Sequence, residues 1–174
     1  MVHDATFLNA ILPFAIGQAE RHREPLSLVC VAIDRLHGIQ NLLGRAVADL
    51  LVRCVGEMVR SLIRESDVVA RLDDDRVVAV MPRSGEDGAL KIGEMICQKV
   101  AERRWLLPNQ PGLLVTVSVG SATYPISADN VFSLFEAADD ALAAAQIQGR
   151  NRAVQAPRMG NVAHYHALIA NGAS

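Results

Sequence analysis

Apolar residues recur along this chain with two different periods, which separate predicted helices from predicted strands. Helical spacing of apolar side chains marks four segments, residues 5–22, 38–63, 84–104 and 130–149. Apolar, β-branched character at strand length marks five others, residues 26–33, 67–72, 76–81, 113–124 and 151–155. The nearly continuous apolar run at 26–33 indicates a strand buried on both faces. NQPG at 109–112 predicts a turn, Asn130 an N-cap, and Gly149 the C′ position of the last helix.

The alternation of helices and strands predicts an α/β fold in which helices flank a mixed β-sheet. The two segments around residues 73–76 are expected to form a β-hairpin that is central in the chain. Residues 1–155, including an N-terminal helix over 4–22, should make up one domain, and residues 156–174 a C-terminal appendage. We expect the N-terminal helix to pack on the core, with pairing to another chain as the alternative.

Composition excludes several classes of protein. With 174 residues, of which 51% are hydrophobic, the chain can form one domain with a sizeable core. A net charge of −2 offers no positive field for nucleic acid or an anionic membrane. No apolar run reaches the roughly 18–20 residues that span a bilayer, so membrane insertion is not expected. Asp4 precedes the first apolar patch and no basic segment does, which argues against a signal peptide and for a cytoplasmic location.

Thiol and imidazole side chains give little sign of chemistry. Cys30, Cys54 and Cys97 are odd in number, widely spaced and set among apolar residues, so they are expected to be buried thiols in a reducing compartment. His164 and His166 could bind a metal, but no acidic or thiol residue accompanies them, and a surface position is the better interpretation. The sequence therefore predicts neither a metal site nor a cofactor.

The segment ARLDDDRVVAVM at 70–81 raises the main functional question, because three aspartates and an arginine fill a tight turn between two apolar runs. Such a turn could hold a metal ion and phosphate, be the solvated tip of a hairpin, or be the remnant of a lost site. Its surroundings decide among these, since five segments of the chain follow one known family in order and spacing. They are residues 26–33, 38–52, 63–82, 115–124 and 137–154.

Across roughly residues 5–155 the sequence resembles the GGDEF family of diguanylate cyclase domains, which join two GTP molecules into cyclic di-GMP. ADDALAAAQIQGRNR, at 138–152, is similar to the family pattern ADxALYxAKxxGRNR and is the most specific segment. The resemblance implies a five-stranded sheet wrapped by helices, like those of adenylate cyclases and polymerase palms. It also implies that the acidic turn carries the family's signature on its hairpin.

The signature departs from the family pattern at four of five positions. Asp73 and Asp74 replace two glycines, Asp75 keeps the acidic third position, Arg76 replaces the fourth acid and Val77 the phenylalanine. Glycines at a hairpin tip permit positive φ and close approach of a nucleotide. Two like charges about 4 Å apart repel by about 1 kcal/mol in water and about 4 kcal/mol near a protein surface, so the new carboxylates should repel a triphosphate.

By the same resemblance, the metal and nucleotide contacts are depleted. Ala32 stands at the metal-binding position, only the second acid of the pattern survives as Asp34, and Asp75 remains the single candidate ligand. Two contacts are replaced and two are retained: Gln40 stands for a base-contacting Asn and Gln146 for a phosphate-facing Lys, whereas Asp49 matches a guanine-contacting Asp and Arg150 a phosphate-binding Arg. We therefore predict a degenerate, inactive cyclase domain with a vestigial nucleotide site.

An RxxD motif, Arg64 and Asp67, lies six positions before the signature, where the family has the inhibitory site that binds cyclic di-GMP. A guanidinium can bind phosphate or stack on guanine, and a carboxylate pairs with the guanine N1–H and N2–H₂ edge. Met95 occupies the position that often adds an arginine, and Lys91 could replace it. Arg71 could join this site or pair with Asp73.

Three functional interpretations follow from these residues. The domain could be a receptor that binds cyclic di-GMP at Arg64 and Asp67 and changes the interaction with a protein partner or a second copy. It could instead be a scaffold or dimerisation module without a ligand. A residual diguanylate cyclase is the least favoured.

Overall fold

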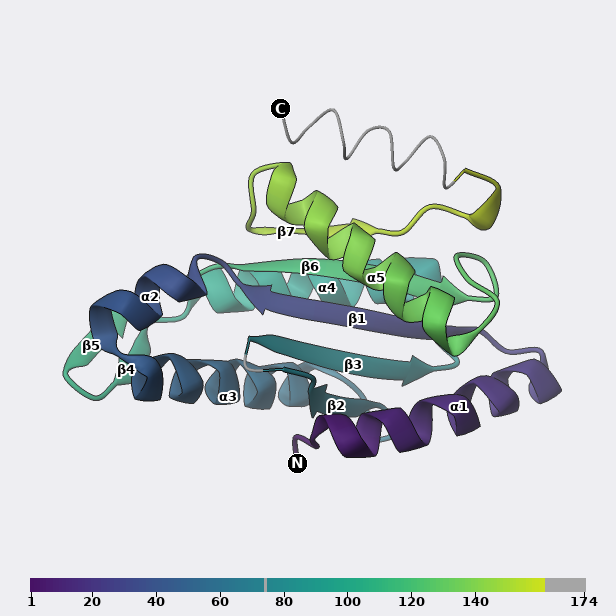
Figure 1. Cartoon of the computed structure of the whole chain (residues 1–174), viewed down its shortest axis with the longest axis horizontal. Coiled ribbons are helices and arrows are strands. Elements are labelled where there is room, and N and C mark those ends of the chain that lie inside the picture. Colours follow the sequence, from purple (N-terminus) through teal and green to yellow (C-terminus); the bar gives the residue numbers. More distant parts are fainter. Residues whose placement is uncertain (74, 162–174) are drawn as a thin grey trace.

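A computed structural model describes residues 1–73 and 75–161. The helices are α1 (Ala5–His22), α2 (Leu36–Leu43), α3 (Arg45–Leu62), α4 (Glu86–Glu102) and α5 (Val131–Ile147), followed by a 3₁₀ turn at Met159–Asn161. The strands are β1 (Leu26–Ile33), β2 (Val68–Arg71), β3 (Arg76–Pro82), β4 (Trp105–Leu107), β5 (Gln110–Leu113), β6 (Val117–Tyr124) and β7 (Arg152–Gln155). Figure 1 shows the arrangement.

Five strands form the main sheet in the order β2-β3-β1-β6-β7, and β4 pairs with β5 in a separate hairpin. All pairings are antiparallel except that of β6 with β7. The mixed α/β fold is therefore as the sequence predicted. The β2–β3 hairpin, central in the chain, supplies the strands at one side of this sheet.

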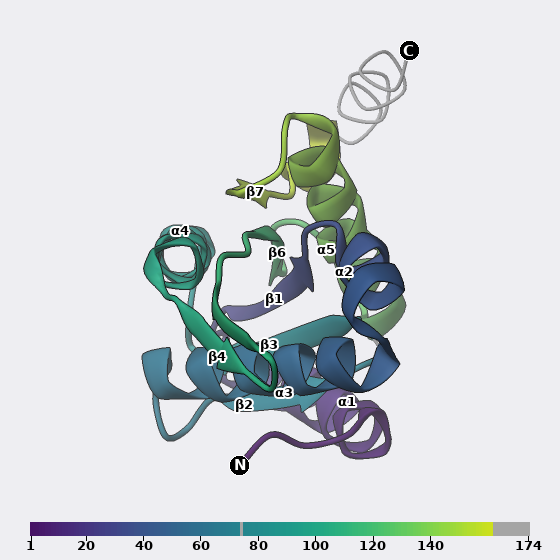
Figure 2. The same ribbon diagram turned by 90° about the vertical axis from the view of Figure 1, so that its left-hand side faces the viewer.

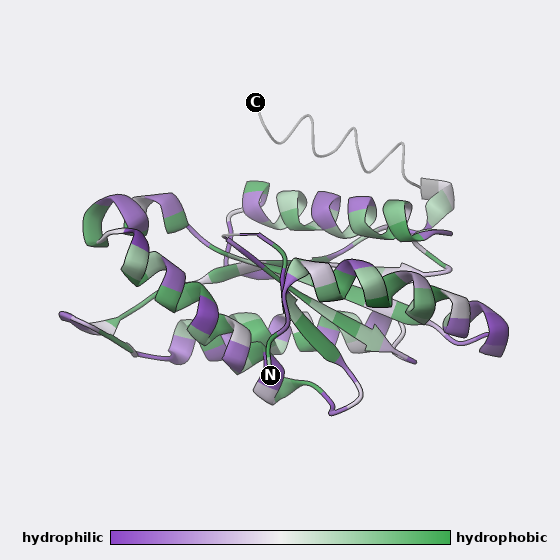
Figure 3. Ribbon diagram, turned by 60° about the horizontal axis from the view of Figure 1, so that its bottom comes forward, coloured by the Kyte–Doolittle hydropathy of each residue, from purple (hydrophilic) through white to green (hydrophobic). Residues whose placement is uncertain are grey.

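Each face of the sheet is covered by helices, and β1 contributes to both layers. Its eight residues are all buried, and because neighbouring strand residues point to opposite faces, they divide between two clusters. Val29, Val31 and Ile33 pack with α3 and α4, whereas Leu28 and Cys30 pack with α1 and α5. Figure 2 shows the two layers of helices, and Figure 3 shows hydrophobic residues gathered in the strands between them.

The N-terminal segment is tied to this domain in two ways. Helix α1 buries Leu8, Leu12 and Ile16 against the sheet, which confirms the predicted core packing. Before it, His3 extends the edge of the sheet, since its N–H donates to the Val69 carbonyl at 2.8 Å and its own carbonyl accepts from the Arg71 N–H at 2.8 Å.

Two predicted elements are wrong in extent. The helix expected over 38–63 is two helices, because Gly44 between them adopts φ +92°, a conformation that ends a helix. The strand expected over 113–124 begins only at Val117. Residues 110–112 of the expected turn, together with residue 113, belong to β5 instead. Trp105 of β4 is buried in the core cluster to which α3 and α4 contribute, so it anchors the β4–β5 hairpin to the core.

The smaller expectations have mixed outcomes. Asn130 caps α5, accepting from the Ser133 N–H at 2.9 Å, and Gly149 follows that helix with φ +119°, both as predicted. Cys30 and Cys97 are buried, and burial raises the pKa of each thiol to about 12, but Cys54 is only partly buried. His164 and His166 lie outside the described residues, with all of 162–174.

Candidate functional site

The predicted nucleotide site forms a pocket of about 370 Å³ between α2, α3 and the hairpin. It is called the tip pocket here and is lined by Leu36, His37, Gln40, Arg45, Ala48, Asp49, Arg71, Asp73 and Asp75. Five of these residues were singled out from the sequence as site residues. His37 and Arg45 were not, although each stands close to a matched position of the resemblance.

Two oppositely charged residues of the tip pocket, Asp49 and Arg71, are paired with each other. Arg71 makes two contacts: its Nη1 lies 2.7 Å from the Asp49 carboxylate, and its Nε donates to the main-chain carbonyl of Asp73 at 3.1 Å. The hydrogen bond from Arg71 and its positive charge lower the pKa of Asp49. The acid expected to contact guanine is therefore already engaged by an arginine.

Arg71 was expected beside Arg64 and Asp67, and this grouping is wrong. Asp67 precedes β2 and Arg71 ends it, and four strand residues at about 3.3 Å each separate the two by roughly 13 Å. The pairing of Arg71 with Asp73, the other expectation, is confirmed through the Asp73 carbonyl rather than its carboxylate.

Arg76 forms a second charged cluster at the start of β3. Its Nη1 donates to Asp139 of α5 at 2.8 Å, and its Nε donates to the Asp73 carboxylate at 3.0 Å, with a further contact from Nη2. In the sheet register Arg76 stands directly opposite Ala32 of β1. Val77, next in the signature, is buried in the core, and Asp74 lies outside the described residues.

Asp34 is a buried acid whose hydrogen-bonding capacity is taken by its neighbours. Its carboxylate accepts from the hydroxyls of Thr116 and Ser118, both at 2.6 Å, and from the Asn151 N–H at 3.0 Å. These contacts join the ends of β1, β6 and β7. The acid is 7% exposed and serves as a structural brace.

The other residues of the predicted nucleotide site lie apart from the tip pocket. Arg150 lines a separate hollow of about 510 Å³ together with Asp34, because positive φ at 149–151 turns the chain there after α5. Gln146 lies in the last turn of α5 and does not line the tip pocket. The expected set of nucleotide contacts is therefore only partly assembled.

The magnesium ion implied by the GGDEF resemblance does not fit these residues. Position 32 offers a methyl group, and its cross-strand partner in β3 is the cationic Arg76. Asp34 already accepts three hydrogen bonds. Within residues 1–73 and 75–161, no group of three or more His, Cys, Asp or Glu side chains is placed to hold a metal ion.

The Arg64–Asp67 turn closes the connection between α3 and β2. The Asp67 N–H donates to the Arg64 carbonyl at 3.1 Å, and Asp67 Oδ2 accepts from the Arg64 N–H at 2.9 Å. Arg60, which the sequence reasoning missed, donates to the carbonyls of both Arg64 and Asp67. The missed signal was a basic residue in the last helical turn, where arginines often bind terminal carbonyls.

The two side chains of the motif differ in exposure. Arg64 is exposed, whereas Asp67 is 2% exposed, and its Oδ1 is buried without a hydrogen-bond partner in the described part of the chain. Burial raises the pKa of Asp67, and the nearby arginines only partly oppose this effect. Both residues line a pocket of about 300 Å³, called the turn pocket here, against Gly88 and Ile92 of α4. Lys91 of the same helix does not line it.

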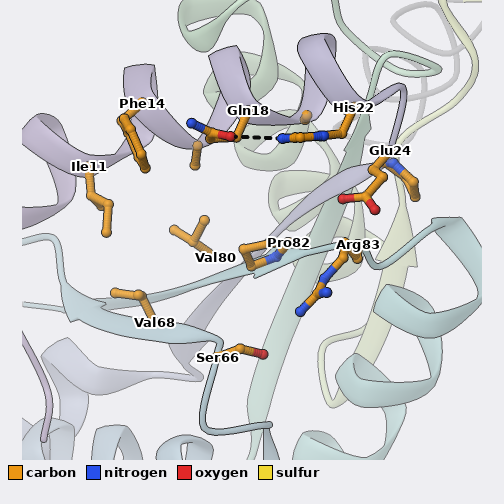
Figure 4. Close-up of a pocket in the computed structure, with 13 residues that line it drawn as sticks. Ile11, Phe14, Gln18, His22, Glu24, Ser66, Val68, Val80, Pro82 and Arg83 are labelled. Atoms are coloured by element: carbon orange, nitrogen blue, oxygen red, sulfur yellow. Dashed lines mark hydrogen bonds between the residues drawn. The ribbon is translucent and has the colours of Figure 1, made fainter.

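A further hollow, of about 410 Å³, lies between α1 and the β2–β3 hairpin. Figure 4 shows apolar side chains, including Ile11, Phe14 and Val80, along one half and polar ones, including His22 and Arg83, along the other. Phe14, which lines this hollow, is 66% exposed. This hollow is called the α1 groove below.

Comparisons with known proteins agree with the arrangement of elements. Diguanylate cyclase A of Treponema denticola is 26% identical over 139 residues, which are 80% of this chain and 37% of that protein. Diguanylate cyclase TpbB of Pseudomonas aeruginosa PAO1 is 33% identical over 147 residues, 83% of this chain and 33% of that protein. The chain thus spans about a third of the length of these curated relatives.

Solved structures are similar over nearly the whole chain. The GGDEF domain of TpbB superposes with a TM-score of 0.87 at 28% identity, covering 95% of each chain. That of DgcB from Caulobacter crescentus, in complex with c-di-GMP, superposes with a TM-score of 0.81 at 23% identity, covering 88% of this chain and 91% of the other.

No helix among the described residues is long and apolar enough to cross a membrane. The family model described as "Diguanylate cyclase, GGDEF domain" matches residues 2–152. This match covers most of the chain and agrees with the sheet order and the position of the hairpin. The chain therefore belongs to the GGDEF family of diguanylate cyclase domains.

Proposed function

We propose that this GGDEF domain does not synthesise cyclic di-GMP and instead binds it as a receptor at the Arg64–Asp67 turn. The proposal is carried by Asp67, whose buried Oδ1 has no partner among the described residues and which lines the turn pocket together with the exposed Arg64. A buried charged acceptor without a partner is costly, and a donor-rich ligand removes that cost. Residual cyclase activity is disfavoured by the composition of the signature.

The chemistry of the turn suits one end of a cyclic dinucleotide. A guanine edge offers two N–H donors to Asp67, and the Arg64 guanidinium offers a planar fork to phosphate or a face to the base. The turn pocket has a volume of about 300 Å³, which is at the lower end of the range for ligand-binding pockets. We therefore expect it to hold one base while the phosphates stay near the surface. The bracing by Arg60 lowers the ordering cost of binding.

A domain of this fold can accommodate the ligand, since DgcB, of the same fold, was crystallised with c-di-GMP. Isothermal titration of the purified chain with cyclic di-GMP tests the proposal. Arg64→Ala should weaken binding about tenfold or more, because losing a charge-assisted contact costs about 1.5–3 kcal/mol. The matched control is Arg71→Ala, an arginine of the tip pocket, which should leave the affinity unchanged.

Binding that survives Arg64→Ala and falls in Arg71→Ala would assign the ligand to the tip pocket instead. Absence of binding up to millimolar ligand would remove the receptor function altogether. In that case the second candidate function, a ligand-independent dimerisation module, takes its place.

The α1 groove favours this second candidate. Phe14 lines this hollow and is 66% exposed, so an exposed apolar ring forms part of the wall of a recess. A two-fold dimer requires a self-complementary patch. Sedimentation equilibrium should then show a dimer that Phe14→Glu converts to a monomer, and a wild-type monomer at all concentrations would exclude it.

A further inference from the structure

The charged cluster around Arg76 lies at the edge of the sheet where the GGDEF resemblance implies a metal ion. Arg76 is the first residue of β3 and stands opposite Ala32 in the antiparallel register. Its side chain is only 28% exposed. A cationic side chain therefore occupies the place beside β1 that a carboxylate–metal pair would need.

Two carboxylates from distant parts of the chain share this one guanidinium. Asp73, at the hairpin tip, accepts from Nε at 3.0 Å, and Asp139, on α5, accepts from Nη1 at 2.8 Å. Burial lowers the pKa of Arg76, but the two carboxylates raise it overall, so the cation is held in its charged form. One positive charge between two acids is the arrangement that a divalent ion creates when carboxylates bind it.

Helix α5 is fixed closely enough to make the contact specific. A Cβ at Gly120 of β6 would lie 2.4 Å from the Ala138 carbonyl oxygen, so only glycine lets the helix backbone approach this strand. Ala138 immediately precedes Asp139. The acid is thus delivered to Arg76 by rigid packing rather than by a mobile loop.

We propose that the Arg76 guanidinium is a built-in substitute for a divalent cation at this edge of the sheet. It neutralises Asp73 and Asp139, joins the hairpin tip to α5 and makes the order of the tip independent of Mg²⁺. Removing it leaves two facing carboxylates that attract a divalent ion. This role of Arg76 does not depend on cyclic di-GMP binding at the Arg64–Asp67 turn.

Thermal unfolding in MgCl₂, against NaCl of equal ionic strength, tests this role. The melting temperature of the wild type should be the same in both salts. Arg76→Ala should melt about 3–6 °C lower without Mg²⁺, because two partly buried carboxylates lose their partner. It should regain about 3–5 °C in Mg²⁺ at ten times its dissociation constant. Arg158→Ala is the control, since Arg158 pairs with Glu86 at 3.3 Å on an exposed surface and should show no Mg²⁺ response.

A saturable Mg²⁺ stabilisation of the wild type would overturn the proposal, as would an Arg76→Ala variant that melts like the wild type or ignores Mg²⁺. Arg76→Lys keeps the positive charge and should stay insensitive to Mg²⁺. If Arg76→Ala fails to fold, Arg76→Gln, which keeps hydrogen-bond donors without the charge, takes its place in the same comparison. Titration of the wild type with Mn²⁺, followed by electron paramagnetic resonance, should detect free ion only, and bound ion at submillimolar concentration would contradict the substitution.

Discussion

The tip pocket and the Arg64–Asp67 turn lie at opposite ends of β2, and they differ in whether their charged groups are paired within the protein. At the tip, Asp49 is paired with Arg71, and the neighbouring Arg76 is paired with two acids. At the turn, the guanidinium of Arg64 forms no ion pair with a described residue, and one oxygen of Asp67 has no partner there. The same residue types are thus internally satisfied in one region and available in the other.

This difference indicates where binding of a polar ligand can give a net gain in free energy. A ligand at the tip must first break internal ion pairs, and its own contacts only replace those that are lost. A ligand at the turn gives a partner to groups that have none, which removes the penalty of a buried unsatisfied acceptor. Resemblance in residue type is therefore a weaker guide to function than the state of each charge in the folded chain.

The largest expected effect concerns catalysis at the tip pocket. We expect no turnover of GTP to cyclic di-GMP with Mg²⁺, and Ala32→Asp alone should not restore it, because Arg76 still stands opposite position 32. A chromatographic assay for product is the measurement. Turnover near the roughly 1–10 per second of ordinary enzymes would show that the tip is a working active site and would end the comparison.

The brace under the turn should have the next largest effect. Arg60→Ala removes hydrogen bonds to the carbonyls of Arg64 and Asp67 and should lower the free energy of unfolding by about 1–2 kcal/mol. Urea denaturation measures this loss. Arg53→Ala, on the same helix and paired with Asp49 at the exposed surface, should cost less than about 0.5 kcal/mol. Equal losses in the two variants would mean that the turn is not specially braced.

Asp67→Asn should separate ligand binding from stability. It should weaken cyclic di-GMP binding, because one acceptor for the guanine edge becomes a donor, yet stay within about 1 kcal/mol of wild-type stability at pH 7. The raised pKa of Asp67 means that the folded state holds a proton more tightly than the unfolded state, so wild-type stability is lost as pH rises from 3.8 through the folded pKa. Urea denaturation between pH 4 and 7 should show that the free energy of unfolding of the wild type rises relative to that of the variant as pH falls. The opposite trend would contradict the raised pKa of Asp67.

The smallest effect is expected at the Asp49–Arg71 pair. Asp49→Asn should lower stability by about 0.5–1 kcal/mol at pH 7, since the pair is partly exposed. The pKa of Asp49 is lowered by Arg71, so its stabilisation is present above pH 3.8 and is lost as pH falls through the folded pKa. Chemical denaturation should therefore give variant and wild type the same stability in strong acid, and a difference that persists there would mean that the carboxylate acts through something other than its charge.

Much of the fold could be predicted because local patterns determine it. The apolar run of β1, the spacing in α1 and the capping residue Asn130 each depend on neighbours in sequence, and each was confirmed. The break at Gly44 could not be predicted, because the apolar spacing continues across it and only the backbone conformation reveals it. The three-residue β4 is too short for a period to be visible.

The candidate site was less predictable because its charges are paired over long range. Arg71 pairs with Asp49, which is 22 residues away in the sequence, and Arg76 pairs with Asp139, which is 63 residues away. The resemblance gives Asp49 a guanine contact and includes Asp139 in the pattern ADxALYxAKxxGRNR, but it indicates an arginine partner for neither acid. Asp34 shows the same limit, since its three donors come from Thr116, Ser118 and Asn151.

The pairing of His3 with β2 bears on how the edge of the main sheet is protected. An uncovered edge strand presents unpaired N–H and C=O groups that can recruit strands of other molecules. His3 occupies two of these groups, on Val69 and Arg71, and stacks on Phe7 with ring centroids 3.8 Å apart. Loss of the first four residues would thus open a short template for intermolecular β-sheet growth beside the hairpin, even though the hydrophobic core would be intact.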